Sequence, residues 1–146
     1  MKAKDILAEK GTRVVTIHKD NLLVDVMSLF FANRIGSLVV VDNNDKILGI
    51  VAPNDVLKAV HSNPDIVAVM TVSEVMTEDV IAGTPEDDVD QLMAIMTRNR
   101  IRHIPIIEQG TLAGLVSIGD AVKALLTVQD VEIRYLKEFI EGKYPA

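Results

Sequence analysis

The chain has no cysteine and no tryptophan, and aromatic residues make up only 3% of its 146 positions. Without cysteine there can be no disulfide, no zinc–thiolate site and no cysteine nucleophile. With so few aromatic residues, the sequence offers little for stacking nucleic-acid bases. The formal net charge of −6 also argues against a broad nucleic-acid surface, which requires clustered cations.

Long apolar runs are missing as well. No run approaches the roughly 20 residues of a membrane-spanning helix, and Met1–Asp5 is not followed by the apolar core of a signal peptide. We therefore expect a soluble, cytoplasmic protein. Hydrophobic residues make up 49% of the chain. A half of about 65 residues would be marginally stable alone, so we expect the two halves to share a core.

The sequence contains an internal repeat. The first copy comprises residues 35–42, 47–51 and 54–59, and the second comprises residues 101–108, 112–116 and 119–124. An internal repeat is stronger evidence for the architecture than any local sequence pattern. Because there are only two copies, each longer than a solenoid unit, we expect a closed pseudo-symmetric pair rather than an open array.

Local patterns place similar elements in both copies. The expected strands are residues 12–17, 38–41, 47–51, 80–82, 104–107 and 112–116. The expected helices are residues 4–9, 22–33 with a cap at Asp20 or Asn21, 53–60, a helix starting at 84–87, and 118–126. A polar tail with one apolar stripe predicts a further terminal helix that docks on the body or contacts another subunit.

The duplicated segments resemble a tandem CBS domain pair, also called a Bateman module, over roughly Met1 to Leu126. The resemblance rests on Gly49-Ile-Val-x-x-x-Asp55, Gly114-Leu-Val-Ser-x-x-Asp120, Ile101-Arg-His-Ile-Pro and Val75-Met-Thr. It implies an α+β fold of the α/β type, with two β-α-β-β-α repeats packed through their sheets and a C-terminal helix. The corresponding boundaries are residues 1–64 for the first repeat, 65–128 for the linker and second repeat, and 129–146 for the tail.

The same resemblance implies a non-catalytic ligand sensor. Such modules bind adenine nucleotides (AMP, ADP or ATP, with NAD and S-adenosylmethionine as further candidates) in two clefts between the repeats, and they signal to an effector protein. No obligatory cofactor is expected. A homodimer formed through helices is also implied, and burial within the monomer is the alternative for its candidate contacts. These contacts are Met27, Phe30, Phe31, Leu92, Met93 and Met96.

The first predicted cleft is built around Ser117 and Asp120. An aspartate in the first turn of a helix can accept both hydroxyl protons of a ribose, and the helix N-terminus suits an anion. The same residues also fit an ordinary Ser-x-x-Asp cap. The resemblance completes this cleft from the first copy with Thr12, Val15, Thr16, Gly36, Ser37 and Leu38.

The second predicted cleft uses Asp55 and departs from the family pattern, because Ala52 and Pro53 offer neither a hydroxyl nor a free N–H at the corner. Arg102 could bind phosphate, because arginine is always charged and can form two parallel hydrogen bonds. The alternatives are that Arg102 is an exposed, solvated side chain and that His103 is a hydrogen-bonded histidine at a strand edge. The resemblance completes this cleft with Ile81, Ala82, Arg102, His103 and Pro105. The two clefts are therefore expected to bind with unequal affinities, and one can remain empty.

Two other functions compete with the sensor. An enzyme is weakly supported, because His18, His61 and His103 have no metal-site spacing and the sequence has no phosphate-binding loop or nucleophile elbow. A structural dimerisation module with one or both clefts empty is the main alternative. A nucleic-acid role fits the charge poorly, and no metal site is expected.

Overall fold

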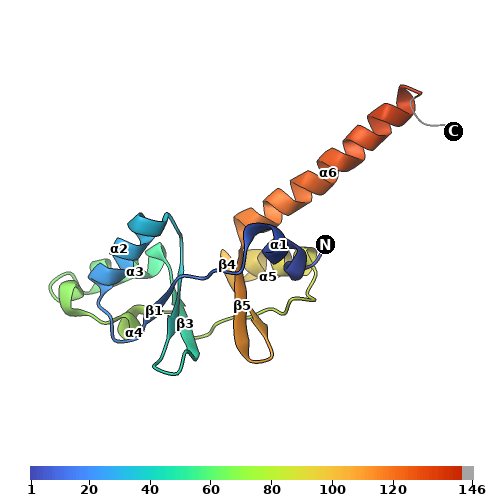
Figure 1. Cartoon of the computed structure of the whole chain (residues 1–146). Helices are drawn as coiled ribbons and strands as arrows, with labels where there is room; N and C mark the ends of the chain where they lie inside the picture. Colours follow the sequence, from blue (N-terminus) through green and yellow to red (C-terminus); the bar gives the residue numbers. More distant parts are fainter. Residues whose placement is uncertain (143–146) are drawn as a thin grey trace.

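The computed structural model describes residues 1–142, so the last four residues of the predicted tail lie outside it. The first half contains α1 (Ala3–Lys10), β1 (Thr16–His18), α2 (Leu23–Asn33), β2 (Leu38–Val41), β3 (Ile47–Val51) and α3 (Pro53–Ser62), and a short 3-10 turn (Val67–Val69) follows it. The second half contains α4 (Val72–Val75), α5 (Val89–Asn99), β4 (His103–Glu108), β5 (Thr111–Ser117) and α6 (Ile118–Ile140) (Figure 1).

The first sheet has the order β1-β2-β3. Strands β1 and β2 pair in parallel, and β2 and β3 pair antiparallel. The central strand β2 is buried at every position, which explains its unbroken run of apolar residues. The second sheet is the β4–β5 hairpin. The two sheets lie next to each other in the middle of Figure 1. His103, the first residue of β4, lies close to Gly36 of the first half. The predicted α+β class is confirmed.

The second half differs from the prediction between residues 80 and 88. Residues 80–82 form no strand, and Gly83 makes a single bridge to Ile106. Residues 84–87 form a turn instead of starting a helix, and within this turn the Asp87 carboxylate accepts the Thr84 N–H (2.8 Å). The carbonyls of Pro85 and Asp87 accept the backbone N–H groups of Lys4 and Ala3 at the start of α1. This segment is therefore shaped by its contact with α1.

Two boundaries in the first half also shift. The predicted strand 12–17 is reduced to residues 16–18, and the cap of α2 is Leu22 rather than Asp20 or Asn21. The Asp25 carboxylate accepts the Leu22 N–H (3.1 Å). A carboxylate three residues inside the helix can satisfy this donor, so the cap itself needs no polar side chain.

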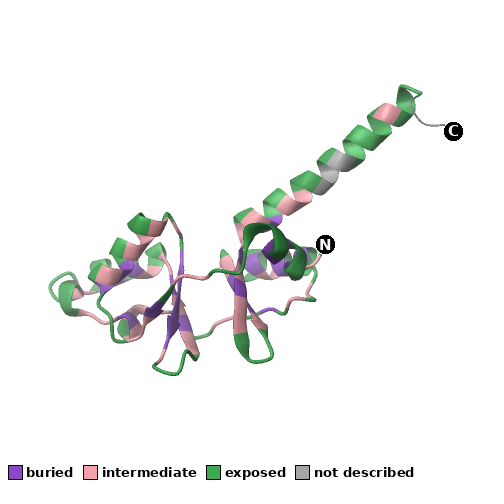
Figure 2. Ribbon diagram, in the orientation of Figure 1, coloured by how far each residue is buried: buried purple, intermediate pink, exposed green. Residues whose placement is uncertain are grey.

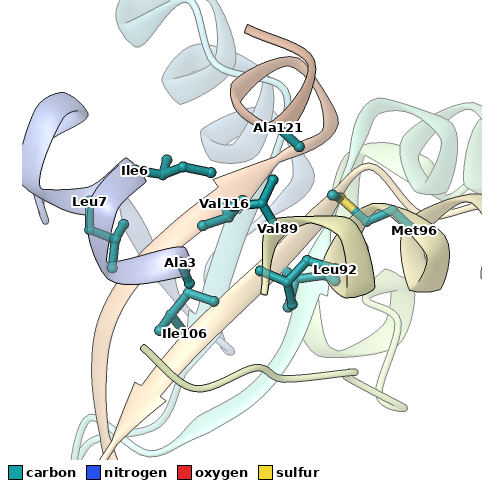
Figure 3. Packing of buried hydrophobic residues seen from close by; sticks show 10 residues of the cluster. Ala3, Ile6, Leu7, Val89, Leu92, Met96, Ile106, Val116 and Ala121 are labelled. Atoms are coloured by element: carbon teal, nitrogen blue, oxygen red, sulfur yellow. The ribbon is translucent and has the colours of Figure 1, made fainter. Parts of the chain in front are cut away.

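Each lead-in helix packs on the opposite half. Ala3, Ile6 and Leu7 of α1 belong to the buried cluster of the second half, together with residues of α5, β4, β5 and α6 (Figure 3). Val72 of α4 belongs to the cluster of the first half. The expected single shared core is therefore wrong. Two clusters form, and exchanged helices connect the halves.

The glycines Gly49 and Gly114 occupy equivalent positions and mark where the exchanged segments dock. A Cβ atom at Gly49 would lie 2.6 Å from the carbonyl oxygen of Thr77, and one at Gly114 would lie 2.5 Å from Cδ2 of Leu7. Both contacts are too close for a side chain. Glycine at these positions lets another segment approach the strand closely.

The helix α6 merges two elements that the sequence analysis predicted separately. After Gly119 no glycine or proline occurs until Gly142, so nothing interrupts the helix. Ala121 is buried against the body, whereas the later turns project away from it (Figure 1) and are mostly exposed (Figure 2). The described part of α6 beyond its first turns therefore does not dock on the body of its own chain.

The predicted dimer contacts divide between surface and core. Leu92 and Met96 are 1% exposed and belong to the core of the second half, so for these two the alternative of burial within the monomer holds. Met93 is partly buried against the same cluster, and Phe30 against that of the first half. Met27 and Phe31 remain exposed on α2.

Candidate functional site

A cavity of about 670 Å³ lies between the two halves. This volume is in the range typical of small-molecule sites. The first half supplies the start of α3 and Gly36, which lies shortly before β2, and the second supplies the segment between α5 and β4. The lining residues are Gly36, Ile50, Ala52, Pro53, Asn54, Asp55, Lys58, Thr77, Asp79, Val80, Ile81, Arg100, Ile101, Arg102 and His103.

Asp55 is fixed at the edge of this cavity by two hydrogen bonds. Its Oδ2 atom accepts the N–H of Ala52 (2.8 Å), and its Oδ1 atom accepts the hydroxyl of Thr77 (3.1 Å). Pro53, the first residue of α3, removes no hydrogen bond from the helix, because the first N–H of a helix has no intrahelical partner. A carboxylate oxygen has more than one acceptor site, so Asp55 can still accept hydroxyl protons from a ligand.

Sequence reasoning missed Thr77. The Val75-Met-Thr segment belongs to the repeat pattern, but the sequence alone gives no role to its threonine. The backbone of Thr77 exchanges two hydrogen bonds with Ile50 on β3 (3.0 and 2.8 Å). Close approach to Gly49 thus brings the threonine hydroxyl to Asp55, and only the tertiary contact reveals it.

The cavity is lined by more cations than anions. Lys58, Arg100 and Arg102 contribute positive charge, against the carboxylates of Asp55 and Asp79. Both arginine residues are exposed. Arginine stays charged and can bind an oxyanion with two parallel hydrogen bonds. This local excess opposes the net negative charge of the chain.

His103 lies where the halves meet. Its ring carbon Cε1 is 3.5 Å from the position that a Cβ on Gly36 would take. Burial lowers the pKa of His103, and the charges of Lys10 and Arg102 lower it further, against the opposing effect of Asp120. The imidazole is therefore neutral at pH 7, with one nitrogen donor and one acceptor.

This shift predicts a pH dependence of stability. Below about pH 6.5 an unfolded histidine takes up a proton, whereas folded His103 stays neutral, so the unfolded state binds more protons. The free energy of unfolding should then fall as the pH drops from about 6.5 towards the folded-state pKa. Urea unfolding between pH 7.5 and 5 should show a smaller loss for His103→Gln. The variant His61→Gln, which removes an exposed imidazole, is the control, and an equal change in both variants would contradict the assignment.

Asp120 does not line this cavity. Its Oδ2 atom accepts the ammonium of Lys10 (2.6 Å) and the N–H of Ser117 (2.9 Å), and its own N–H donates to Ser117 Oγ (3.0 Å). Lys10 also donates to the carbonyl of Leu115 (2.9 Å). Partial burial raises the pKa of Asp120, but the hydrogen bonds from Lys10 and Ser117 outweigh burial and hold that pKa below its usual range. The helix-cap interpretation of these residues is thus realised.

The other residues predicted for the first cleft have varied surroundings. Leu38 is wholly buried in the core, Val15 packs against the same cluster, and Thr12 and Thr16 are exposed. Gly36 lines the cavity beside Asp55 instead. Ser37 is 3% exposed, and its hydroxyl is the buried side-chain atom without a hydrogen-bond partner among residues 1–142.

Of the residues predicted for the second cleft, four line the cavity, namely Asp55, Ile81, Arg102 and His103. Ala82 is exposed outside the lining, and buried Pro105 accepts the N–H of Gly83 through its carbonyl. In the described part of the chain, no group of three or more histidine and acidic residues could hold a metal ion. None of its helices is both long and apolar enough to cross a membrane.

Comparisons with known proteins agree with this architecture. The CBS domain model matches residues 3–62 and 72–127. The CBS domain-containing protein CBSX3, mitochondrial, of Arabidopsis thaliana is 34% identical over 129 residues, which cover 86% of this chain and 63% of the plant protein. The crystal structure of the CBS-domain containing protein ATU1752 from Agrobacterium tumefaciens is 41% identical with a TM-score of 0.82, covering 84% of this chain and 92% of that one.

A more distant structure shares the fold. The CBS domain pair of protein MJ0100, in complex with 5′-methylthioadenosine and S-adenosyl-L-methionine, is 24% identical with a TM-score of 0.74. The match covers 88% of this chain and 98% of that one. CBS domain pairs are regulatory modules. On the family match and the repeat geometry together, the chain belongs to the CBS domain family and carries two CBS domains in tandem.

Proposed function

We propose that this chain is a non-catalytic regulatory module that binds an adenine nucleotide in the cavity beside Asp55 and reports its occupancy to an effector protein. The observation that carries the proposal is the cavity itself, where a fixed carboxylate faces the same space as three cations. A ribose needs the first of these features and a phosphate needs the second.

Each part of a nucleotide has a counterpart among the lining residues. Asp55 would accept the ribose hydroxyls, and Arg100 and Arg102 would bind phosphate. Apolar side chains such as Ile81 would contact the adenine. The complex of MJ0100 with two adenosine derivatives supports the adenosine part, and the cations here favour a phosphorylated ligand, so AMP, ADP and ATP are the first candidates.

The cavity is lined from both halves, which suggests how binding would be transmitted. A ligand that contacts α3 and the segment before β4 together favours the arrangement in which the halves are correctly spaced. It can shift the equilibrium only by its different affinity for the two arrangements. An effector protein, or a second copy in a homodimer, would then detect the favoured arrangement.

The cleft at Asp120 would bind more weakly. A ribose there would have to displace the ammonium of Lys10, which occupies Oδ2 of Asp120 and is also held by a backbone carbonyl. The proposal therefore assigns the dominant site to Asp55 and the weaker one to Asp120.

The test is thermal unfolding of the full chain with AMP, ADP, ATP, NAD or S-adenosylmethionine. A ligand at 100 times its Kd adds about 2.7 kcal/mol to the free energy of unfolding, which raises Tm by several degrees. The ligand-induced shift should disappear in Asp55→Ala and persist in Asp120→Ala. Each variant is compared with its own ligand-free Tm, because both aspartates also cap a helix.

Three results would contradict parts of the proposal. A shift lost only in Asp120→Ala would move the dominant site to the other cleft. No shift with any of the five ligands in a folded protein would leave the structural dimerisation module as the better account. Chromatography of the nucleotide after incubation should recover it unchanged, and turnover would contradict the non-catalytic assignment.

A further inference from the structure

The exposed part of α6 carries an apolar stripe with the spacing of a coiled coil. Apolar residues alternate three and four positions apart along the helix, with one polar residue in the series, and α6 is continuous through all of them. The series is Val122, Leu126, Gln129, Ile133, Leu136 and Ile140. A 3-4 alternation places the a and d positions of a heptad along one seam.

The apolar residues of this stripe are exposed in the described part of the chain. Leu126, Ile133 and Leu136 are 54%, 56% and 57% exposed, and Ile140 is 81% exposed. The helix projects from the body in Figure 1, and its outer turns are mostly exposed in Figure 2. In proteins most helical stability comes from the packing of an apolar face, so an exposed apolar stripe indicates a missing partner.

We propose that α6 pairs with α6 of a second copy as a parallel two-stranded coiled coil. The flanking charges decide the orientation. In the parallel arrangement Glu132, at a g position, faces Lys137 of the partner subunit, at an e position, and two-fold symmetry forms this ion pair twice.

The antiparallel arrangement brings like charges together. With the stripes fully overlapped, Glu132 faces Glu132 of the partner subunit, and Asp130 faces Asp130 of the partner subunit. Lys123 also approaches Lys137 of the partner subunit. Like charges facing one another across a helix pair select against that orientation. This surface is distinct from the exposed residues of α2, and the proposal does not depend on nucleotide binding.

The absence of cysteine makes single-cysteine cross-linking the direct test. Under mild oxidation of the full chain, Leu126→Cys and Ile140→Cys should each form disulfide-linked dimers, because equivalent seam positions meet in a parallel pair. The control Thr127→Cys places the thiol one residue off the seam and should stay largely monomeric on a non-reducing gel. Sedimentation of the reduced proteins shows whether they associate without the cross-link.

A charge exchange gives an independent readout. Glu132→Lys and Lys137→Glu should each weaken the dimer several-fold in sedimentation equilibrium, and the double variant should recover most of the loss. Cross-linking of a Leu126→Cys and Leu136→Cys mixture into a heterodisulfide would instead indicate the antiparallel pair. Dimers that persist without any seam cross-link would show that another face, such as α2, forms the interface. Either result would overturn the proposal, as would a monomer at all concentrations.

Discussion

Replacing Leu7 by alanine should lower the free energy of unfolding by about 2–5 kcal/mol, the range for truncating a large buried aliphatic side chain. Leu7 is 6% exposed, and its methyl groups lie over Gly114. It lies at the start of the first repeat in the sequence, yet it packs in the core of the second half. The substitution should therefore destabilise the second half, although Leu7 lies near the start of the sequence.

Amide hydrogen exchange would reveal that location. In Leu7→Ala, the amides of β4 and β5 should exchange faster than in the wild type, while those of β2 and β3 change less. The reciprocal variant Val72→Ala removes a wholly buried side chain of α4 from the first-half core, so it should reverse the pattern. Equal acceleration in both halves for both variants would show that they unfold as one unit.

Gly49→Ala should destabilise the fold by about 1–3 kcal/mol, as overpacking of a well-packed site usually does. Its added Cβ would lie 2.6 Å from the carbonyl oxygen of Thr77, which is held by a backbone bridge to Ile50. Relief of this clash would move Thr77 away from Asp55, so the variant should also lose much of its nucleotide-induced Tm shift.

Gly114→Ala is the matched control for this prediction. The closest atoms there are the flexible end of the Leu7 side chain, which can move more easily than a backbone carbonyl. Its destabilisation in chemical denaturation should be smaller, and its nucleotide-induced shift should be retained. A larger loss in Gly114→Ala than in Gly49→Ala would mean that the backbone bridge at Thr77 adapts readily.

Sequence reasoning predicted the elements that depend on local pattern. Strand β2 was predicted from its apolar run and α3 from Pro53 at its first turn, and both were confirmed. It was wrong at residues 84–87, where proline and acidic residues are typical of a helix start but serve to hold α1. Local propensity carries no information about the contact with α1, which lies about 80 residues earlier in the sequence.

The candidate site divides in the same way. The motif drew attention to Asp55, Arg102 and His103, and these residues do line one cavity. Thr77 and Lys10 were not predicted, because each acts through a contact between distant segments. The same motif at Asp120 cannot show that a lysine from α1 already occupies its carboxylate.

The exchange of α1 and α4 also bears on how such a chain could originate. Each half takes one helix of its core from the start of the other repeat. A chain with a single repeat would bury its own sheet only by pairing with another copy and trading lead-in helices with it, as in domain swapping. Duplication and fusion would turn that swapped dimer into one polypeptide, and the symmetry-related helices would then be free to diverge.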